Sequence, residues 1–222
     1  IDAAAAKPGG DEVWVAEGVY NENRTEQWGG AGVEYTGSLV MKDNVHVYGG
    51  FRGGETLRRQ RMVYDHATHY PRTIINGATS RGGSAAYHVV VFGKQVSPVL
   101  NARLDGFGIT GGNANGITNE YHTYRGGGIY NWISSPVIAN CMIYGNVAQV
   151  SGGGMANESS RVGGVDYAAN AEIYNCVFFA NQAGRQPDYI ANPVRGGGGI
   201  FFNRGVDPLW TSPDRSEERR VG

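Results

Sequence analysis

The sequence has 222 residues, of which 36 are Gly and 17 are Asn, the two residue types that most readily adopt a left-handed backbone. This composition excludes a helical bundle, and a hydrophobic content of 41% excludes a disordered linker. The formal net charge is −1 and no long run of one sign occurs, so we expect no nucleic-acid partner.

The chain contains 2 Cys, too few for a disulfide framework or for a four-thiolate zinc site. We expect no cofactor and no metal. No stretch approaches 18 consecutive apolar residues, so no membrane span is predicted in this chain.

The first half of the chain predicts a short helix followed by short strands. Residues 1–6 are rich in Ala and are followed by Pro8 and Gly9, which indicates one or two helical turns covering the end of a sheet stack. The predicted strands, each closed by Gly, Asn or Asp, are 13–16, 39–41, 45–48, 73–75 and 88–92.

The second half contains an internal repeat. Segments 104–114, 138–148 and 173–183 align without gaps, and they begin 34 and 35 residues apart. Apolar residues alternate along each copy, as in a strand that directs every second side chain inward. Two columns of the alignment contain only Gly or Asn, and both predict left-handed backbone, the first at a bend and the second at the end of the strand. These columns are Gly106, Asn140 and Asn175, and Gly112, Asn146 and Asn181.

Three Gly-rich segments, 126–131, 152–157 and 197–203, follow the repeat copies or lie between them. The recurring order of strand, bend, strand, Gly-rich turn and strand predicts an all-β fold, a parallel β-helix in which each coil stacks on the last. A β-sandwich also has many short strands, but it does not explain matched turn columns. Variable loops are expected on the outside of the coils, at 53–70, 113–125, 158–171 and 184–195.

Residues 215–222 depart from this pattern because five of the eight are charged. They resemble the translation of a sequencing adapter, and the alternative is a solvated charged tail. We therefore expect one β-helix domain over residues 1–214, as a C-terminally truncated fragment.

Residues 10–20, residues 47–51, residues 104–114 and the Gly-Gly-Gly units together resemble the bacterial right-handed parallel β-helix proteins of the pectin-lyase-like superfamily. Within it they are most similar to the polymorphic outer-membrane-protein-like surface group, and the resemblance covers residues 1–205. It implies an extracellular or cell-surface, outer-membrane-associated protein with an adhesin-like or display role. The implied partners are a carbohydrate or a host or cell-surface protein. Some superfamily members are polysaccharide lyases or glycoside hydrolases.

The sequence predicts no catalytic residue. A β-helix hydrolase needs converging carboxylates, and Asp105 is the single acid in the aligned columns, where its Asp-Gly pair favours a turn. Asp65, His66 and His69 are the densest titratable group, but a third strong metal ligand is not evident. A non-catalytic display scaffold is therefore the first hypothesis, and a polysaccharide lyase or glycoside hydrolase is the alternative.

The sequence also allows predictions for the two cysteines and for a set of aromatic residues. Cys141 and Cys176 occupy one column, and we expect two inward thiols in the core because parallel strands aim both Cβ atoms the same way. The candidate binding residues are aromatic residues expected to face outward, where they can contact a sugar ring or a partner unless inserted loops cover them. They are Tyr130, Trp132, Tyr144, Phe179 and Phe201.

Overall fold

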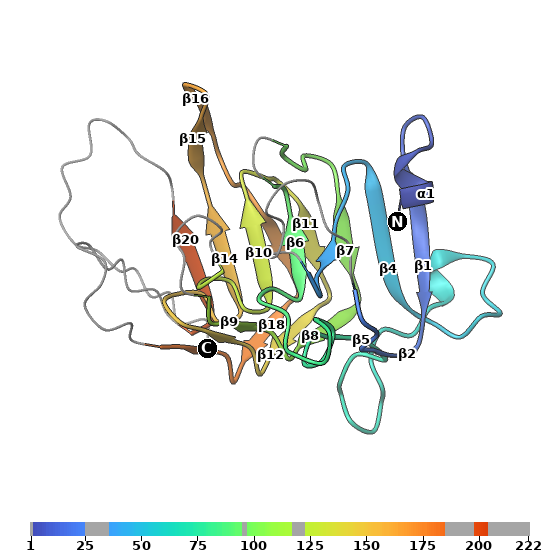
Figure 1. Ribbon diagram of the computed structural model, residues 1–222. Helices are drawn as coiled ribbons and strands as arrows, with labels where there is room; N and C mark the ends of the chain where they lie inside the picture. The colour runs from blue at the N-terminus through green and yellow to red at the C-terminus, as the bar shows by residue number, and fades with distance from the viewer. Residues whose placement is uncertain (1, 25–35, 95–96, 117–122, 185–197, 204–222) are drawn as a thin grey trace.

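A computed structural model describes residues 2–24, 36–94, 97–116, 123–184 and 198–203 (Figure 1). The expected tail at 215–222 and part of the loops at 113–125 and 184–195 lie outside these residues. Nearly all of the regular secondary structure in the described residues is β-strand, and the long sheets are parallel throughout.

Three parallel sheets enclose the interior. Sheet A consists of β1 (Asp11–Ala16), β4 (Val45–Phe51), β7 (Arg103–Asp105), β11 (Val137–Ala139) and β17 (Glu172–Tyr174). Sheet B consists of β2 (Gly18–Tyr20), β5 (Thr73–Asn76), β8 (Phe107–Thr110), β12 (Met142–Tyr144) and β18 (Val177–Phe179). Sheet C consists of β3 (Leu39–Val40), β6 (Val90–Phe92), β10 (Ile129–Trp132), β14 (Met155–Glu158) and β20 (Ile200–Asn203).

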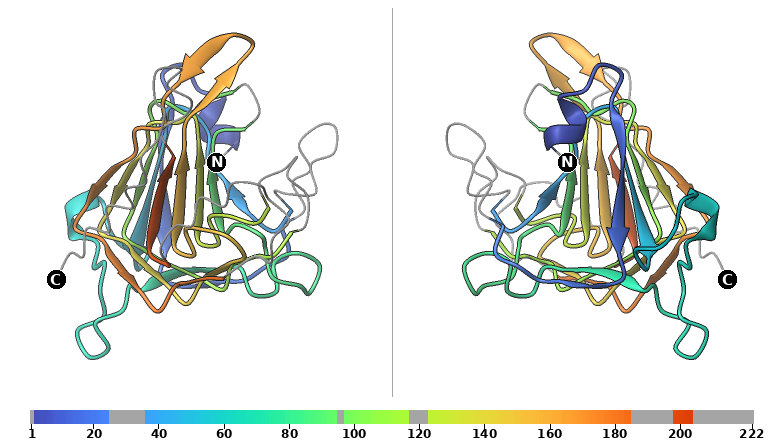
Figure 2. Two further views of the ribbon diagram at one scale, coloured as in Figure 1. Left: turned by 90° about the vertical axis from the view of Figure 1, so that its left-hand side faces the viewer. Right: turned by 90° about the vertical axis from the view of Figure 1, so that its right-hand side faces the viewer.

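The chain runs through sheets A, B and C in the same order five times, and each passage is called a coil here. From the third coil onward a small sheet D is added between B and C, formed by β9 (Asn113–Ala114), β13 (Val147–Ala148) and β19 (Gln182–Ala183). Figure 2, which views the coils end on, shows the sheets as the sides of a roughly triangular section. The arrangement is all-β and compatible with a β-helix-like solenoid.

The register between coils follows the sequence repeat. Ile138 pairs with Leu104 of the preceding coil and with Ile173 of the following coil. Leu104 and Ile138 are buried in the central core, and the partly buried Ile173 packs against it. In sheet B, Ile143 pairs in the same way with Ile109 and Phe178. Like residues therefore stack on like residues, as the alignment predicts.

The first Gly/Asn column is confirmed as a left-handed bend between sheets A and B. The φ angles of Gly106, Asn140 and Asn175 are 89°, 50° and 48°. A left-handed residue at this point turns the chain sharply, and Gly and Asn adopt it at the least cost. The bend separates β7, β11 and β17 from the strands of sheet B that follow them.

The second Gly/Asn column does not supply the left-handed residues expected at the end of the strand. The left-handed residues there are Gly111, Gly145 and Ala180, each one position earlier. Asn146 instead points into the interior, where it is fully buried. Its side-chain amide donates to the carbonyls of Ile109 and Tyr144 at 3.0 and 3.1 Å, and its side-chain oxygen accepts from the Gly112 N–H at 3.0 Å.

Replacement of Asn146 by Ala should therefore lower the free energy of unfolding by about 2 kcal/mol, because it leaves buried backbone groups of two coils without partners. Chemical denaturation measures the loss. The matched control is Asn115→Ala, at an exposed position, for which a change within about 0.5 kcal/mol is expected. Equal effects at the two sites would contradict the structural role of Asn146.

The N-terminal helix is shorter than expected, and one segment expected to be a loop contains strands. The helix α1 (Asp2–Ala5) is a single short turn beside β1, and its Ala4 packs into the central core. The segment expected as a loop at 158–171 contains an antiparallel hairpin, β15 (Ser160–Val162) and β16 (Val165–Tyr167), which projects from the coils in Figure 1. The φ angles of Gly163 and Gly164, 58° and 84°, suit the two-residue turn between these strands.

Among the described residues, no helix has the length and apolar character needed to cross a membrane.

Candidate functional site

The five candidate aromatic residues lie in two separate groups. Tyr130, Trp132 and Phe201 are on the side of sheet C that faces away from the central core, as predicted, but they do not form an open surface. Tyr130 is 1% exposed and Phe201 is 6% exposed, so these two outward-facing rings are covered rather than open to solvent. The His88 ring stacks on Tyr130 with centroids 4.8 Å apart, and Arg125 lies over the Phe201 ring at 5.4 Å. Both rings belong to a second hydrophobic cluster on the outer face of sheet C, formed by Val40, Val91, Tyr130, Ala156 and Phe201.

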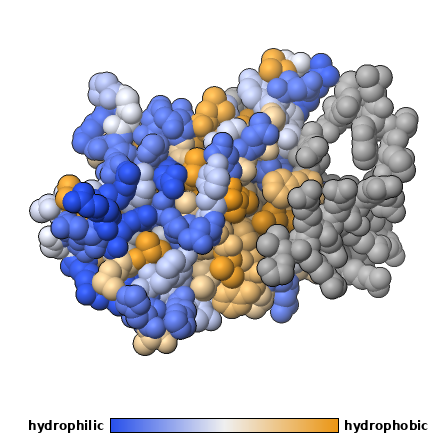
Figure 3. Space-filling model, turned by 180° about the vertical axis from the view of Figure 1, so that it is seen from behind, coloured by the Kyte–Doolittle hydropathy of each residue, from blue (hydrophilic) through white to orange (hydrophobic). Residues whose placement is uncertain are grey.

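Tyr144 and Phe179 form the other group, on the outer face of sheet B. Their rings stack with centroids 5.2 Å apart, and both are half-buried. Tyr70, from the loop that precedes β5, places its ring edge against both, at 5.3 and 6.1 Å. Val177 beside them is 48% exposed, and Figure 3 shows apolar residues gathered on this part of the surface. The sequence did not indicate Tyr70, because it lies in a loop without periodicity.

A groove lies on the outer face of sheet A, between β1 and the loop that follows β4. Its volume is about 520 Å³, and we name it the arginine groove. Strand β1 contributes Glu12 and Trp14, and the loop contributes residues 56–59 and Arg61. The alternation of β1 places Glu12 and Trp14 on the exposed face while Val13 and Val15 pack against the core.

Side-chain to backbone hydrogen bonds shape the loop that forms one wall of this groove. The Glu55 carboxylate accepts hydrogen bonds from the backbone N–H groups of residues 52, 53 and 54, at 2.8, 2.9 and 3.1 Å. The Gln60 side-chain oxygen accepts from the N–H groups of Thr56 and Leu57, at 2.9 and 2.8 Å, around the single turn η2 (Arg58–Gln60). These bonds give a defined conformation to the segment that contains Arg58, Arg59 and Arg61.

The loop is anchored to the coils by two of those arginines. Arg58 forms an ion pair with Glu12, donates to the Tyr48 hydroxyl at 3.0 Å, and lies over the Tyr48 ring at 4.6 Å. Arg61 donates to the backbone carbonyls of Gly49 and Asp105 at 3.1 and 2.9 Å and pairs with the Asp105 carboxylate. The loop therefore touches coils one, two and three.

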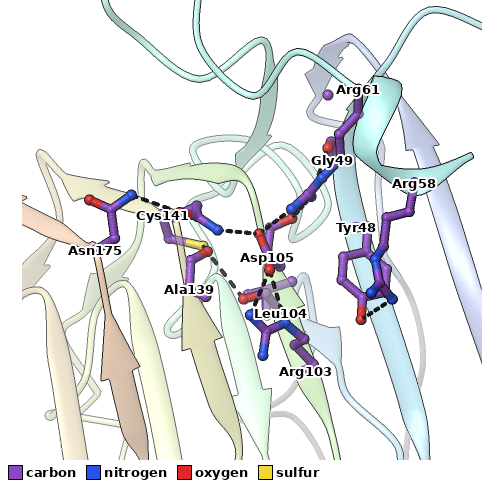
Figure 4. Close-up of polar contacts among 12 residues, drawn as sticks. Tyr48, Gly49, Arg58, Arg61, Arg103, Leu104, Asp105, Ala139, Cys141 and Asn175 are labelled. Atoms are coloured by element: carbon purple, nitrogen blue, oxygen red, sulfur yellow. Dashed lines mark hydrogen bonds and ion pairs between the residues drawn. The ribbon is translucent and has the colours of Figure 1, made fainter.

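Asp105 is the centre of this network (Figure 4). It is 3% exposed and lies between Arg61 and Arg103, whose guanidinium nitrogens donate to both of its carboxylate oxygens. The Asn140 amide donates to Asp105 at 2.8 Å, and Asn175 donates to the Asn140 oxygen at 2.7 Å. The bend column and the acid thus form one hydrogen-bonded ladder across three coils.

The environment of Asp105 keeps it ionised. Burial by itself would raise the pKa of this carboxyl. Hydrogen bonds from Asn140 and Arg61, the charge of Arg61 and a hydrogen bond from Arg103 outweigh burial and lower the pKa below its ordinary value of 3.8. The carboxylate therefore has little access to solvent and accepts hydrogen bonds from three side chains. The expectation of a structural role for Asp105 agrees with this geometry.

Glu158 is a second buried acid, in sheet C. Its side chain is 2% exposed and pairs with Arg125 at 3.2 Å. Burial raises the pKa of Glu158. The charge of Arg125 and its hydrogen bond act in the opposite direction. Glu158 lies in sheet C and Asp105 in sheet A, and each carboxylate is paired with arginines of its own.

The titratable group at Asp65, His66 and His69 does not assemble into a metal site. Asp65 accepts hydrogen bonds from the N–H groups of Ala67 and Thr68, both at 3.0 Å, and pairs with Arg72 at 2.9 Å. Those hydrogen bonds lower the pKa of Asp65, since they stabilise the carboxylate. Across the described ranges, no cluster of three or more His, Cys, Asp or Glu residues could hold a metal ion.

Cys141 and Cys176 are free thiols in the core, as expected. Cys141 is fully buried, and Cys176 of the next coil accepts a hydrogen bond from the Cys141 backbone N–H at 3.4 Å. Burial raises the pKa of Cys141 well above its ordinary value, which suits an unreactive packing residue.

Comparison of the chain with protein-family models, with curated proteins and with solved structures yields no match. The arginine groove combines a tryptophan, three arginines and a loop fixed by hydrogen bonds. An aromatic surface beside guanidinium groups can stack on a ring and bind an anion, whereas Asp105 is positioned to hold the loop.

Proposed function

We propose that the coils form a right-handed parallel β-helix of the pectin-lyase-like kind, similar to the polymorphic outer-membrane-protein-like surface group. Parallel strands joined by a crossover connection are right-handed in nearly all proteins, which supports the handedness. The resemblance of the repeat and of the Gly-rich units to proteins of this family supports membership of it.

The proposed role is that of a non-catalytic display scaffold in an exported or cell-surface protein. The observation that carries it is the attachment of the 53–61 loop to three successive coils through Arg58, Arg61 and Asp105. A recognition loop that is already fixed on a rigid stack loses little conformational entropy when it binds a partner. Carbohydrate or a protein of another cell surface is the expected partner class.

A polysaccharide lyase or glycoside hydrolase is the alternative, and the cluster of Asp105 with Arg61 and Arg103 is what favours it. Acid–base catalysis requires a carboxyl group that reaches the substrate. Asp105 is buried and already has two guanidinium groups and an amide as partners. The display role therefore accounts better for its environment.

One experiment tests both functions on the same samples. The purified protein is incubated with insoluble uronic-acid-containing and neutral polysaccharides and with bacterial cell envelopes. Reducing ends and unsaturated uronates are then measured in the supernatant, and retained protein in the pellet. We expect retention on at least one material without release of product.

Release of product that is abolished in Asp105→Asn, while the circular dichroism spectrum of the variant stays that of the native protein, would favour the enzyme. Failure to be retained on any material would overturn the recognition role.

A further inference from the structure

The arginine groove is an open depression with enough volume for a small ligand. Its volume of about 520 Å³ falls within the usual range for such sites, roughly 300–1,000 Å³. One wall is a strand of sheet A, and the other is the loop fixed by Glu55 and Gln60. Because both walls are held by hydrogen bonds, the groove exists before a ligand arrives.

Trp14 supplies a flat surface in this groove. Its indole stacks on Phe51, with centroids 4.5 Å apart and planes inclined by 10°, and remains 38% exposed. The indole N–H donates to Glu12 at 2.9 Å, which fixes the orientation of the ring. Leu57 on the opposite wall is 44% exposed. Trp14 and Leu57 therefore offer exposed apolar surface to one face of a ring-shaped ligand.

The charge in the groove selects for an anion. Three arginines line it against a single glutamate. Arg58 pairs with that glutamate and Arg61 pairs with Asp105. Arg59 is exposed, and it forms no ion pair with any residue in the described part of the chain. A planar guanidinium of this kind binds a carboxylate or a sulfate through two parallel hydrogen bonds.

The surface next to the groove offers a path for a longer ligand. In the register of sheet A, Glu12 pairs with His46, and His46 pairs with Arg103 of the third coil. These residues face outward from three successive coils. They extend the polar surface of the groove along the stack, at the interstrand spacing of about 4.8 Å. A linear polymer of polar rings can follow such a surface.

We propose that the arginine groove binds an acidic saccharide, with a sugar ring against Trp14 and its anionic group on Arg59. This inference rests on the proposed recognition role and names the ligand class of that site. Carboxylate and sulfate groups share the required chemistry, and the experiment separates them.

The test is isothermal titration calorimetry of the full chain with three hexasaccharides: an alginate oligouronate, a heparin-derived sulfated oligosaccharide and neutral maltohexaose. At least one anionic hexasaccharide should bind about tenfold or more tightly than maltohexaose, with an affinity that falls as salt is added. Whichever of the two binds more tightly identifies the anionic group. Equal affinity for the neutral sugar would overturn the proposal.

Variants locate the site. Arg59→Ser should weaken binding of the preferred hexasaccharide about tenfold, and Trp14→Ala should weaken it to a similar degree. The matched control is Arg161→Ser on the β15–β16 hairpin, where the arginine side chain is 53% exposed, and it should bind as the native protein does. Because Trp14 packs on Phe51, its replacement can disturb the fold, and circular dichroism of Trp14→Ala checks this. Arg59 is exposed, so its replacement is not expected to change the fold.

An unchanged affinity in Arg59→Ser would overturn the groove assignment. If that variant were still retained on polysaccharide or envelopes, the display function would stand while the groove proposal failed.

Discussion

Replacement of Asp105 by Ala should lower the free energy of unfolding by about 3–5 kcal/mol. The side chains of Asp105 and Arg61 are 4% and 11% exposed, so removal of the carboxylate leaves a guanidinium group that is largely shielded from water without its counter-charge. The variant also removes the acceptor for Asn140 and for Arg103. The loss is large because the network joins three coils and the 53–61 loop. Urea denaturation of the native protein and of the variant measures it.

The dependence of this effect on pH provides a control. The folded-state pKa of Asp105 lies below its ordinary value of 3.8, so the stability from its ionised form is fully present above that value. It is lost as the pH falls below 3.8 through the folded-state pKa. Asp105→Asn keeps an oxygen acceptor but has no charge to titrate, so its stability should depend less on pH in this range than that of the native protein. Parallel pH profiles for the two proteins would contradict the role of the carboxylate.

Replacement of Gly127 by Ala should lower the free energy of unfolding by about 3 kcal/mol. A Cβ atom at this position would lie 2.2 Å from the carbonyl oxygen of Val147 and 2.9 Å from that of Gly153, and both belong to the backbone of the next coil. The backbone of a packed coil cannot move aside without disturbing its own hydrogen bonds. Thermal unfolding followed by circular dichroism measures the loss as a lower melting temperature.

The matched control for this substitution is Gly54→Ala. A Cβ atom at Gly54 would meet nothing within 4 Å, and the residue lies in an exposed part of the loop. We expect its melting temperature to stay close to that of the native protein. Equal melting temperatures of the two variants would contradict the close approach of neighbouring coils at Gly127.

The sequence repeat predicted the parts of the fold that depend on stacking. When coils stack in register, one position meets its equivalent in each neighbouring coil, and selection for packing repeats the same residue type. Ile138 and the first Gly/Asn column follow this rule, and their environments match the prediction. Gly106 stands where the other two copies have Asn because a Cβ atom there would lie 2.9 Å from the Arg61 guanidinium.

Other features could not be predicted from the repeat. Asn suits both a left-handed bend and a buried ladder, so Asn140 and Asn146 look alike in the alignment although they have different roles. Alternation places Tyr130 and Phe201 outside the coil but does not indicate what covers that side. The arginine groove is formed by a loop that occurs once, so no column of the repeat marked Arg58, Arg59 and Arg61 as one wall of a site.

The central claim is that equivalent residues of successive repeats stack in parallel register. Nuclear Overhauser effects between methyl groups of Ile, Leu and Val, measured on protein labelled at these methyls, test it most directly. Cross-peaks are predicted from Ile138 to Leu104 and to Ile173, and from Ile143 to Ile109, at the spacings of 34 and 35 residues along the chain. Absence of these cross-peaks, with contacts between sequence neighbours in an antiparallel pattern instead, would contradict the stacked coils and every site built on them.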